Sequence, residues 1–314
     1  MSAAAITTGG PLVRRPLVGY AMVLAAATLF GVNGSVAKVA LSSGLSSLRL
    51  TEARCAGACI GLTLVGLVRS PSGLRIRRSE LLRIAVFGVC GVALVQLFYF
   101  LAIHRLAIGI ALVIQYLGPL LVAIYARTFG REHVRRRVWA ALALSLTGLA
   151  LMVELWKGVA LDGLGVVFAL ISAVIFAAYL LLAEYEVAYR DSVSLMAWGF
   201  FFATVFWTVA QPWWSFPART VAETVSLQGR LAGWHLPVWA LVLWVVVLGS
   251  IVPFALIVGA LRHVSATRVG IAAMLEPVVA TVVAWIWLRE TLAPVQLAGA
   301  AVVLAAILLA QTGR

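Results

Sequence analysis

One carboxyl group in this sequence lies well inside an apolar segment. Glu276 precedes Pro277 within residues 269–288, a stretch that contains no other charged residue. A charged side chain at the centre of a membrane-spanning helix costs about 2.5–3.5 kcal/mol, so Glu276 must face a partner, a cavity or a proton. It could bind the ammonium group of a solute or exchange a proton. The alternative is a structural role, in which Glu276 holds helices together.

Other polar side chains lie inside apolar segments at spacings that bring them together. Gln115 precedes Pro119 by four residues, and Gln96 precedes Tyr99 by three, so each pair shares one helix face. The expected wall of a substrate-binding cavity comprises six residues: Asn33, Gln96, Tyr99, Gln115, Tyr179 and Glu276. For each of them the alternative is an interhelical hydrogen bond, worth about 0.6 kcal/mol.

Two prolines are expected to interrupt membrane-spanning helices. Pro119 and Pro277 each remove a backbone donor in mid-helix and free a carbonyl group, which membranes tolerate only where neighbours or water satisfy it. We expect these kinks to be gating points, with simple packing kinks as the alternative.

Three charged residues lie near the turn between the first two apolar segments. Lys38 ends the first segment and Glu52 begins the second, so a tight turn is expected to pair them and to leave Arg54 slightly deeper. Arg54 is interpreted as part of this structural group, with the binding of an anionic group as the alternative.

The elements that must position these residues are membrane-spanning helices. The sequence is 63% hydrophobic and 11% charged, which excludes an ordinary soluble domain. Apolar segments of roughly 20 residues, the length that spans a bilayer, follow one another along the chain. They predict an all-α integral membrane protein with ten spans, at residues 17–40, 45–68, 81–103, 107–126, 138–153, 163–183, 193–211, 237–261, 269–288 and 292–310.

The basic residues indicate membrane orientation. The net charge of +13 would suggest nucleic acid in a soluble protein, but these residues gather in short loops between apolar spans. About two thirds of the 24 Lys and Arg residues fall on the side that holds both tails, so both termini are predicted to be cytoplasmic. We expect a multi-pass protein of a bacterial-type inner (plasma) membrane, with the lipid bilayer and no nucleic acid as partner.

The two halves of the chain share an internal repeat. Gly118-Pro119 and Arg131-Glu132 align with Glu276-Pro277 and Arg289-Glu290 at one constant offset of about 158 residues. The predicted domains are residues 17–154 and 162–311, each with five spans. Because five is odd, the second half must enter the membrane from the opposite side, which is the inverted-repeat arrangement of secondary transporters.

Several motifs resemble the EamA family of the drug/metabolite transporter superfamily over nearly the whole chain. They comprise Phe30-Gly31-Val32-Asn33-Gly34-Ser35 with Lys38, Arg54, Met274-Leu275-Glu276-Pro277 and Leu288-Arg289-Glu290-Thr291-Leu292. The resemblance implies two inverted five-helix repeats around a central cavity. The segment Gln115-Tyr116-Leu117-Gly118-Pro119-Leu120 is similar to members that export threonine and homoserine, although Arg289 stands where the family often has Gly.

These features predict a secondary active transporter that exports a small metabolite such as an amino acid by alternating access, with proton coupling through Glu276. A multidrug or other metabolite transporter of the same fold, a passive channel and an intramembrane enzyme are the alternatives. The sequence has no Walker motif, and its histidines lie at span ends or in loops, so we expect no enzyme, no cofactor and no metal. The oligomeric state stays open, a homodimer included.

Overall fold

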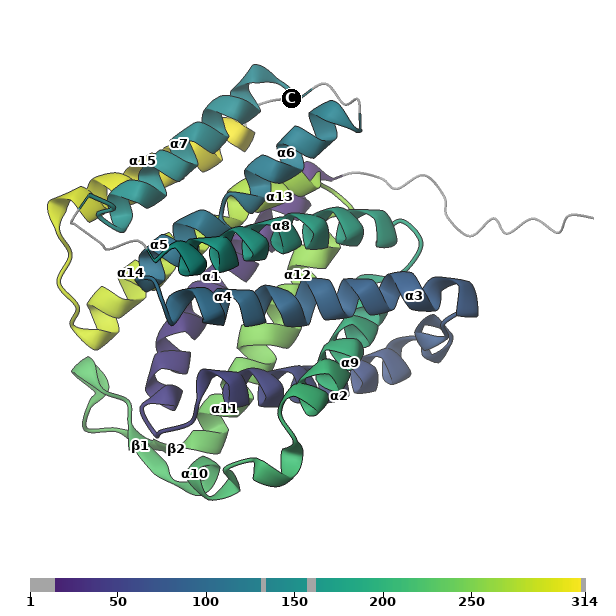
Figure 1. The fold of residues 1–314 in the computed structure, drawn as a ribbon, viewed down its shortest axis with the longest axis vertical. Helices are drawn as coiled ribbons and strands as arrows, with labels where there is room; N and C mark the ends of the chain where they lie inside the picture. Colours follow the sequence, from purple (N-terminus) through teal and green to yellow (C-terminus); the bar gives the residue numbers. More distant parts are fainter. Residues whose placement is uncertain (1–14, 131–133, 157–161, 312–314) are drawn as a thin grey trace, which may run out of the picture.

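The computed structural model describes residues 15–130, 134–156 and 162–311, which form a helical bundle (Figure 1). The Arg131-Glu132 part of the repeat lies outside these residues. The first half contains α1 (Pro16–Leu41), α2 (Ser47–Arg69), η1 (Pro71–Leu74), α3 (Arg78–Val86), η2 (Phe87–Leu94), α4 (Val95–Ile103), α5 (Ile108–Gln115), α6 (Gly118–Thr128) and α7 (Arg136–Met152).

The second half contains the corresponding long helices and one longer loop with short elements. It comprises α8 (Gly163–Glu186), α9 (Ser192–Ala210), η3 (Trp213–Ser215), α10 (Ala218–Ala222), β1 (Thr224–Ser226), η4 (Gly229–Leu231), β2 (His235–Pro237), α11 (Val238–Val246), η5 (Val247–Ile251), α12 (Val252–Ala260), α13 (Ala266–Ala273), α14 (Leu275–Leu288) and α15 (Pro294–Gln311). Strands β1 and β2 form an antiparallel hairpin in the loop that precedes α11.

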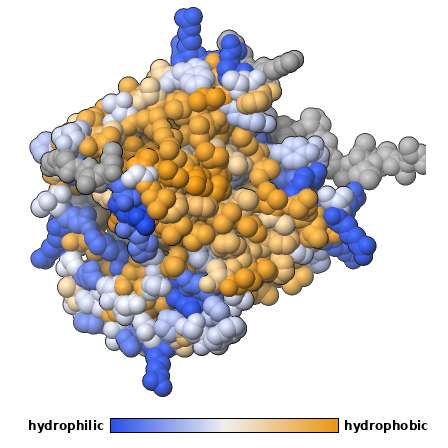
Figure 2. Space-filling model, in the orientation of Figure 1, coloured by the Kyte–Doolittle hydropathy of each residue, from blue (hydrophilic) through white to orange (hydrophobic). Residues whose placement is uncertain are grey.

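In the part of the chain that the structure describes, nine helical segments are long and apolar enough to cross a membrane. The predicted fifth span corresponds to α7, whose 17 residues are at the lower end of the spanning range. Figure 2 shows a broad hydrophobic face with hydrophilic residues toward its rims. Large apolar side chains such as Leu64, Val174 and Leu308 are exposed, as expected of a surface that faces lipid.

Contacts between the two halves follow a symmetric pattern. Helix α1 packs against α12 and α14 of the second half, and α8 packs in the same way against α4 and against α5 and α6 of the first half. Helices α2 and α9 pair with each other, as do α7 and α15, which lie side by side in Figure 1. Exchanging the halves therefore preserves the helix contacts.

The α7–α15 pair is unusually close because glycines face each other across it. A Cβ atom at Gly148 would lie 2.8 Å from the carbonyl oxygen of Gly299, and one at Gly299 would lie 2.6 Å from that of Gly148. Small residues let membrane helices approach until their backbones touch. This contact fixes α7 and α15 as one unit.

Helix irregularities also occur at equivalent places in the two halves. Stretches of π-helix, η2 and η5, interrupt the third span of each half. The next span is broken between α5 and α6 in the first half and between α13 and α14 in the second. Both breaks stand directly before the prolines, Pro119 and Pro277, which cannot donate a backbone hydrogen bond.

The expected pairing of Lys38 with Glu52 is wrong. Lys38 Nζ instead donates to Glu290 Oε1 at 2.6 Å, in a pair that joins the end of α1 to the segment after α14. Glu52 is fully buried and accepts from Arg49 Nη1 at 2.6 Å. Arg49 lies one turn before Glu52 on the same helix, so the local ion pair forms and leaves Lys38 to a partner distant in sequence.

Candidate functional site

A cavity of about 240 Å³ lies among helices of both halves. All six residues predicted to bind substrate border it: Asn33, Gln96, Tyr99, Gln115, Tyr179 and Glu276. They come from α1, α4, α5, α8 and α14. The structure thus places all six around one cavity. Arg54 from α2 and the aromatic rings of Phe30, Phe176 and Phe254 border the same cavity.

Glu276 reaches this cavity from the first turn of α14, immediately after the break in its span. The Tyr116 hydroxyl donates to Glu276 Oε2 at 3.1 Å and lies 3.4 Å from the carbonyl oxygen of Ala273. Tyr116 is itself buried in the break between α5 and α6. The two broken helices therefore meet through a hydrogen bond to a carboxyl group.

Tyr116 was not among the residues predicted from the sequence. It directly follows Gln115 and so does not share the polar face that links Gln115 to Pro119 in an unbroken helix. The break after Gln115 changes the direction of the following side chains. The Gly-Pro that begins α6 is the sequence signal that pointed to this change.

Gln115 begins a chain of hydrogen bonds between helices. Its Nε2 donates to Ser172 Oγ on α8 at 3.1 Å, and Ser172 Oγ donates in turn to the carbonyl oxygen of Val95 at 3.1 Å. This chain links α5, α8 and α4. Gln115 thus combines the interhelical hydrogen bond considered for it with a position in the cavity wall.

Asn33 and Tyr179 each lie against a glycine of a π-helical segment. A Cβ atom at Gly249 in η5 would overlap the Asn33 amide, and one at Gly91 in η2 would lie 2.6 Å from Tyr179 Cδ2. Tyr179 also stacks between Phe87 and Phe176. The two residues are equivalent by the repeat and occupy equivalent surroundings, although their side chains differ in chemistry.

The two prolines are buried next to the helix breaks. Pro119 packs on α13, where a Cβ atom at Gly270 would lie 2.7 Å from Pro119 Cγ. Pro277 follows Glu276 in α14, and its carbonyl oxygen accepts from Thr281 Oγ1 at 2.8 Å. Each proline thus lies in the first turn of the helix that follows the break.

Arg54 has no role in the turn to which the sequence assigned it. It lies in the second turn of α2 and borders the cavity. Its Nε and Nη2 atoms are buried and have no hydrogen-bond partner. Arg54 and Glu276 both border the cavity, so its wall contains a guanidinium group and a carboxyl group.

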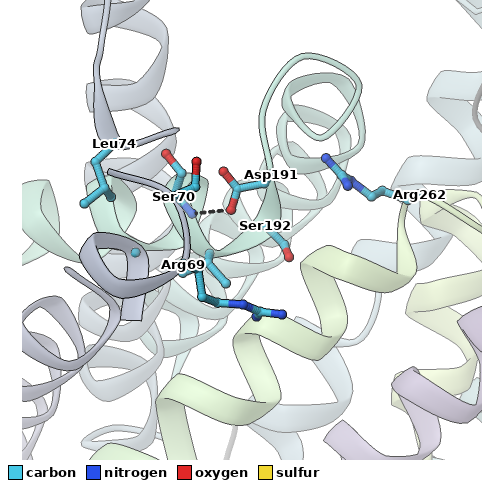
Figure 3. Close-up of a pocket in the computed structure, with 9 residues that line it drawn as sticks. Arg69, Ser70, Leu74, Asp191, Ser192 and Arg262 are labelled. Atoms are coloured by element: carbon cyan, nitrogen blue, oxygen red, sulfur yellow. Dashed lines mark hydrogen bonds between the residues drawn. The ribbon is translucent and has the colours of Figure 1, made fainter. Parts of the chain in front are cut away.

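A second cavity, of about 310 Å³, lies at the ends of α2, α9 and α12. Figure 3 shows Arg69 and Arg262 extending toward the region around Ser192. Asp191 caps α9 by accepting from the Ser194 N–H at 3.0 Å, and Arg262 Nη2 donates to the carbonyl oxygen of Arg190 at 3.0 Å. This space is a charged pocket where helices end.

The sequence matches the EamA-like transporter family over residues 17–154 and 163–312. The chain belongs to this family. It is therefore a multi-pass membrane protein of the drug/metabolite transporter type, and membership of a transporter family argues against an enzyme.

Two relatives of this EamA protein have names that specify a cargo. The threonine/homoserine exporter RhtA of Escherichia coli (strain K12) is 27% identical over 264 residues, which cover 84% of this chain and 79% of the exporter. RhtA of Salmonella typhimurium (strain LT2) is 25% identical over the same shares. An uncharacterized transporter of Archaeoglobus fulgidus is 28% identical over 230 residues, 73% of this chain and 75% of that protein.

A crystal structure of another protein has the same fold. Its TM-score is 0.73 over 94% of this EamA chain and 95% of that chain, at 17% sequence identity. At this identity the likeness concerns the fold alone.

Proposed function

We propose that this EamA protein is a secondary active transporter that exports a small metabolite, an amino acid of the threonine or homoserine type, across the inner membrane. The observation that carries the proposal is a cavity bordered by polar residues of both repeats, with Glu276 held in its wall by Tyr116. Ionisable residues inside membrane helices mark transport pathways and proton relays. The names of the RhtA relatives favour an amino acid as cargo.

Alternating access is the proposed mechanism. The symmetric helix contacts and the helix breaks at equivalent positions support two repeats of opposite orientation, with both termini in the cytoplasm. Pro119 and Pro277 are the proposed gating points, since a break without a backbone donor lets the two parts of a helix change their relative angle. Rocking of one repeat against the other then opens the cavity on alternate sides.

Proton coupling is assigned to Glu276. A cationic ammonium group and a proton both neutralise a carboxylate, so each can displace the other from Glu276. Binding of a proton from one side then favours release of the cargo, and the return of the protonated carrier, which releases the proton on the other side, completes the exchange.

A multidrug transporter is the second candidate, favoured by the aromatic rings that border the cavity. The cavity volume of about 240 Å³ argues for a smaller cargo, because pockets for drug-sized ligands enclose about 300–1,000 Å³. Competition of threonine flux by aromatic cations separates the two candidates.

The test is counterflow in liposomes that contain the purified protein. Radiolabelled threonine or homoserine should enter against an unlabelled internal pool, saturably and in response to an imposed pH gradient. Glu276→Gln keeps the size of the side chain and an acceptor for Tyr116, so counterflow should persist while the response to the pH gradient is lost. Gln311→Glu, at the end of α15, is a control for the introduction or loss of a single charge.

Three results would contradict the proposal. Non-saturable flux would indicate a channel, and a Glu276→Gln protein that behaves as wild type would remove the proton role. The absence of counterflow for every amino acid would exclude this cargo and direct the search to drugs, sugars and nucleotide-like metabolites.

A further inference from the structure

Arg54 differs in its partners from the arginines that form ion pairs. Among the described residues, ion pairs link four other arginines to carboxylates at 2.6–3.4 Å: Arg49 with Glu52, Arg83 with Glu186, Arg105 with Asp162 and Arg190 with Glu80. Arg54 instead presents two buried guanidinium nitrogens without a hydrogen-bond partner. A buried charge that lacks partners is costly, so this arrangement needs a compensating group.

Glu52, two residues before Arg54 on α2, does not supply that group. Glu52 is fully buried against Arg49, which also donates to the Pro212 carbonyl oxygen at 3.3 Å and to Ser215 Oγ at 2.5 Å. Arg49 is thus fixed by the loop after α9, and Glu52 is fixed by Arg49. Arg54 lies about 7.5 Å further along the helix axis than Arg49, and it borders the cavity.

The remaining charge in the cavity wall is Glu276. Its Oε2 accepts from Tyr116, which fixes the position of the carboxyl group on the side of α14, whereas Arg54 projects from α2. Both side chains border the same cavity, one from each repeat. A molecule that carries a carboxylate and an ammonium group can satisfy both charges at once, because it offers the opposite charge to each.

We propose that Arg54 binds the carboxylate of the cargo while Glu276 binds its ammonium group, so that the cavity selects small zwitterions such as α-amino acids. This inference rests on the proposed function and adds a specificity-determining residue to it. The planar guanidinium group donates two parallel hydrogen bonds to a carboxylate, which a neutral amide or an ester cannot accept with equal strength. The aromatic rings of Phe30, Phe176 and Phe254 are then available to contact the side chain of the cargo.

The test compares competitors that differ by one charged group. Counterflow of radiolabelled L-threonine into liposomes is competed with L-threonine, with L-threoninamide, which lacks the carboxylate, and with 3-hydroxybutyrate, which lacks the ammonium group. In the wild type we expect threonine to compete about 10- to 100-fold better than either analogue, the effect of one lost hydrogen-bonded charge.

Arg54→Gln should reduce the preference for threonine over threoninamide to about threefold or less, and Arg54→Lys should retain part of it. The preference over 3-hydroxybutyrate should persist in both, because it depends on Glu276. Arg105→Gln is the matched control, since Arg105 forms a half-exposed pair with Asp162 away from the cavity, and it should retain the wild-type ratios. Thermal unfolding and size-exclusion profiles check that the variants fold.

The outcomes separate this inference from the proposed function. Saturable threonine counterflow that threoninamide inhibits as well as threonine, or an Arg54→Gln protein with wild-type ratios, overturns the role of Arg54 and leaves the transporter intact. Absence of counterflow for all amino acids overturns the cargo itself. If Arg54→Gln does not fold, the competitor series on the wild type still decides whether the carboxylate is recognised.

Discussion

In the first repeat the helix break is followed by Gly118 and Pro119, whereas in the second it is followed by Glu276 and Pro277. At Gly118 a Cβ atom would lie 2.7 Å from Phe176 Cδ1, so the aromatic ring of α8 fills the space that a larger side chain would need. At Glu276 the side chain instead enters the cavity and meets Tyr116. The same backbone break therefore serves close packing in one repeat and places a charge in the other.

Moving the charge to the first repeat tests this comparison most severely. Gly118→Glu should prevent folding or lower the free energy of unfolding by about 3–5 kcal/mol, because it combines a clash with Phe176 and a buried charge. The measurement is thermal unfolding in detergent together with the yield of monodisperse protein. Gly163→Glu, at an open position in the first turn of α8, is the control and should be nearly neutral. Equal stability of the two variants would contradict the proposed difference between the breaks.

Restoring a backbone donor at each break tests whether both breaks gate. Pro119→Ala and Pro277→Ala should each lower the maximal counterflow rate by about 10-fold with little change in the concentration for half-maximal flux. A straighter helix is expected to slow the conformational change and to leave the affinity for the cargo unchanged. Pro294→Ala at the exposed start of α15 is the control. A loss confined to Pro277→Ala would assign gating to the second repeat alone.

Removing the donor to Glu276 tests how far the second break depends on the first. Tyr116→Phe deletes a hydrogen bond of 3.1 Å to the carboxyl group while keeping the ring that packs against Phe176. The half-maximal threonine concentration should rise about 3- to 10-fold, because Glu276 loses its orientation. Tyr125→Phe, on an exposed part of α6, should leave it unchanged. An equal effect of both variants would remove Tyr116 from the site.

The smallest change in stability is expected at the exposed contact between Lys38 of the first repeat and Glu290 of the second. Lys38 and Glu290 form an ion pair whose side chains are 59% and 48% exposed. Lys38→Gln should therefore change the free energy of unfolding by less than about 1 kcal/mol, and less still at high salt. Chemical denaturation at two salt concentrations measures this. A larger loss that does not depend on salt would show that Lys38 contributes through packing of its aliphatic stem.

The sequence predicted the apolar spans well, because a bilayer demands about 20 apolar residues whatever the tertiary contacts are. It also predicted which polar residues border the cavity. Asn33, Gln115 and Glu276 lie in apolar helices, and the lipid-facing surface excludes such groups, so the interior is the place left for them. Their proposed role in binding remains a prediction.

What could not be predicted depends on contacts between distant residues. The partner of Lys38 lies 252 residues away, and nothing near Lys38 in the sequence indicates it. The π-helical segments η2 and η5 arise from backbone hydrogen bonds that several sequences can make, so no residue type marks them. Arg54 was assigned to the turn because its sequence neighbours are charged, whereas the helix rotates by about 200° over two residues and so directs Arg54 away from Glu52.

The glycine contact between α7 and α15 provides a fixed internal distance for measurements on this protein. Since Gly148 and Gly299 bring the two backbones together, any sliding of one helix past the other would drive a carbonyl group into a Cα atom. We therefore expect the separation of these helices to stay constant through the transport cycle. Fluorophores attached along this pair would supply a fixed internal ruler, against which single-molecule distances across the cavity can be calibrated.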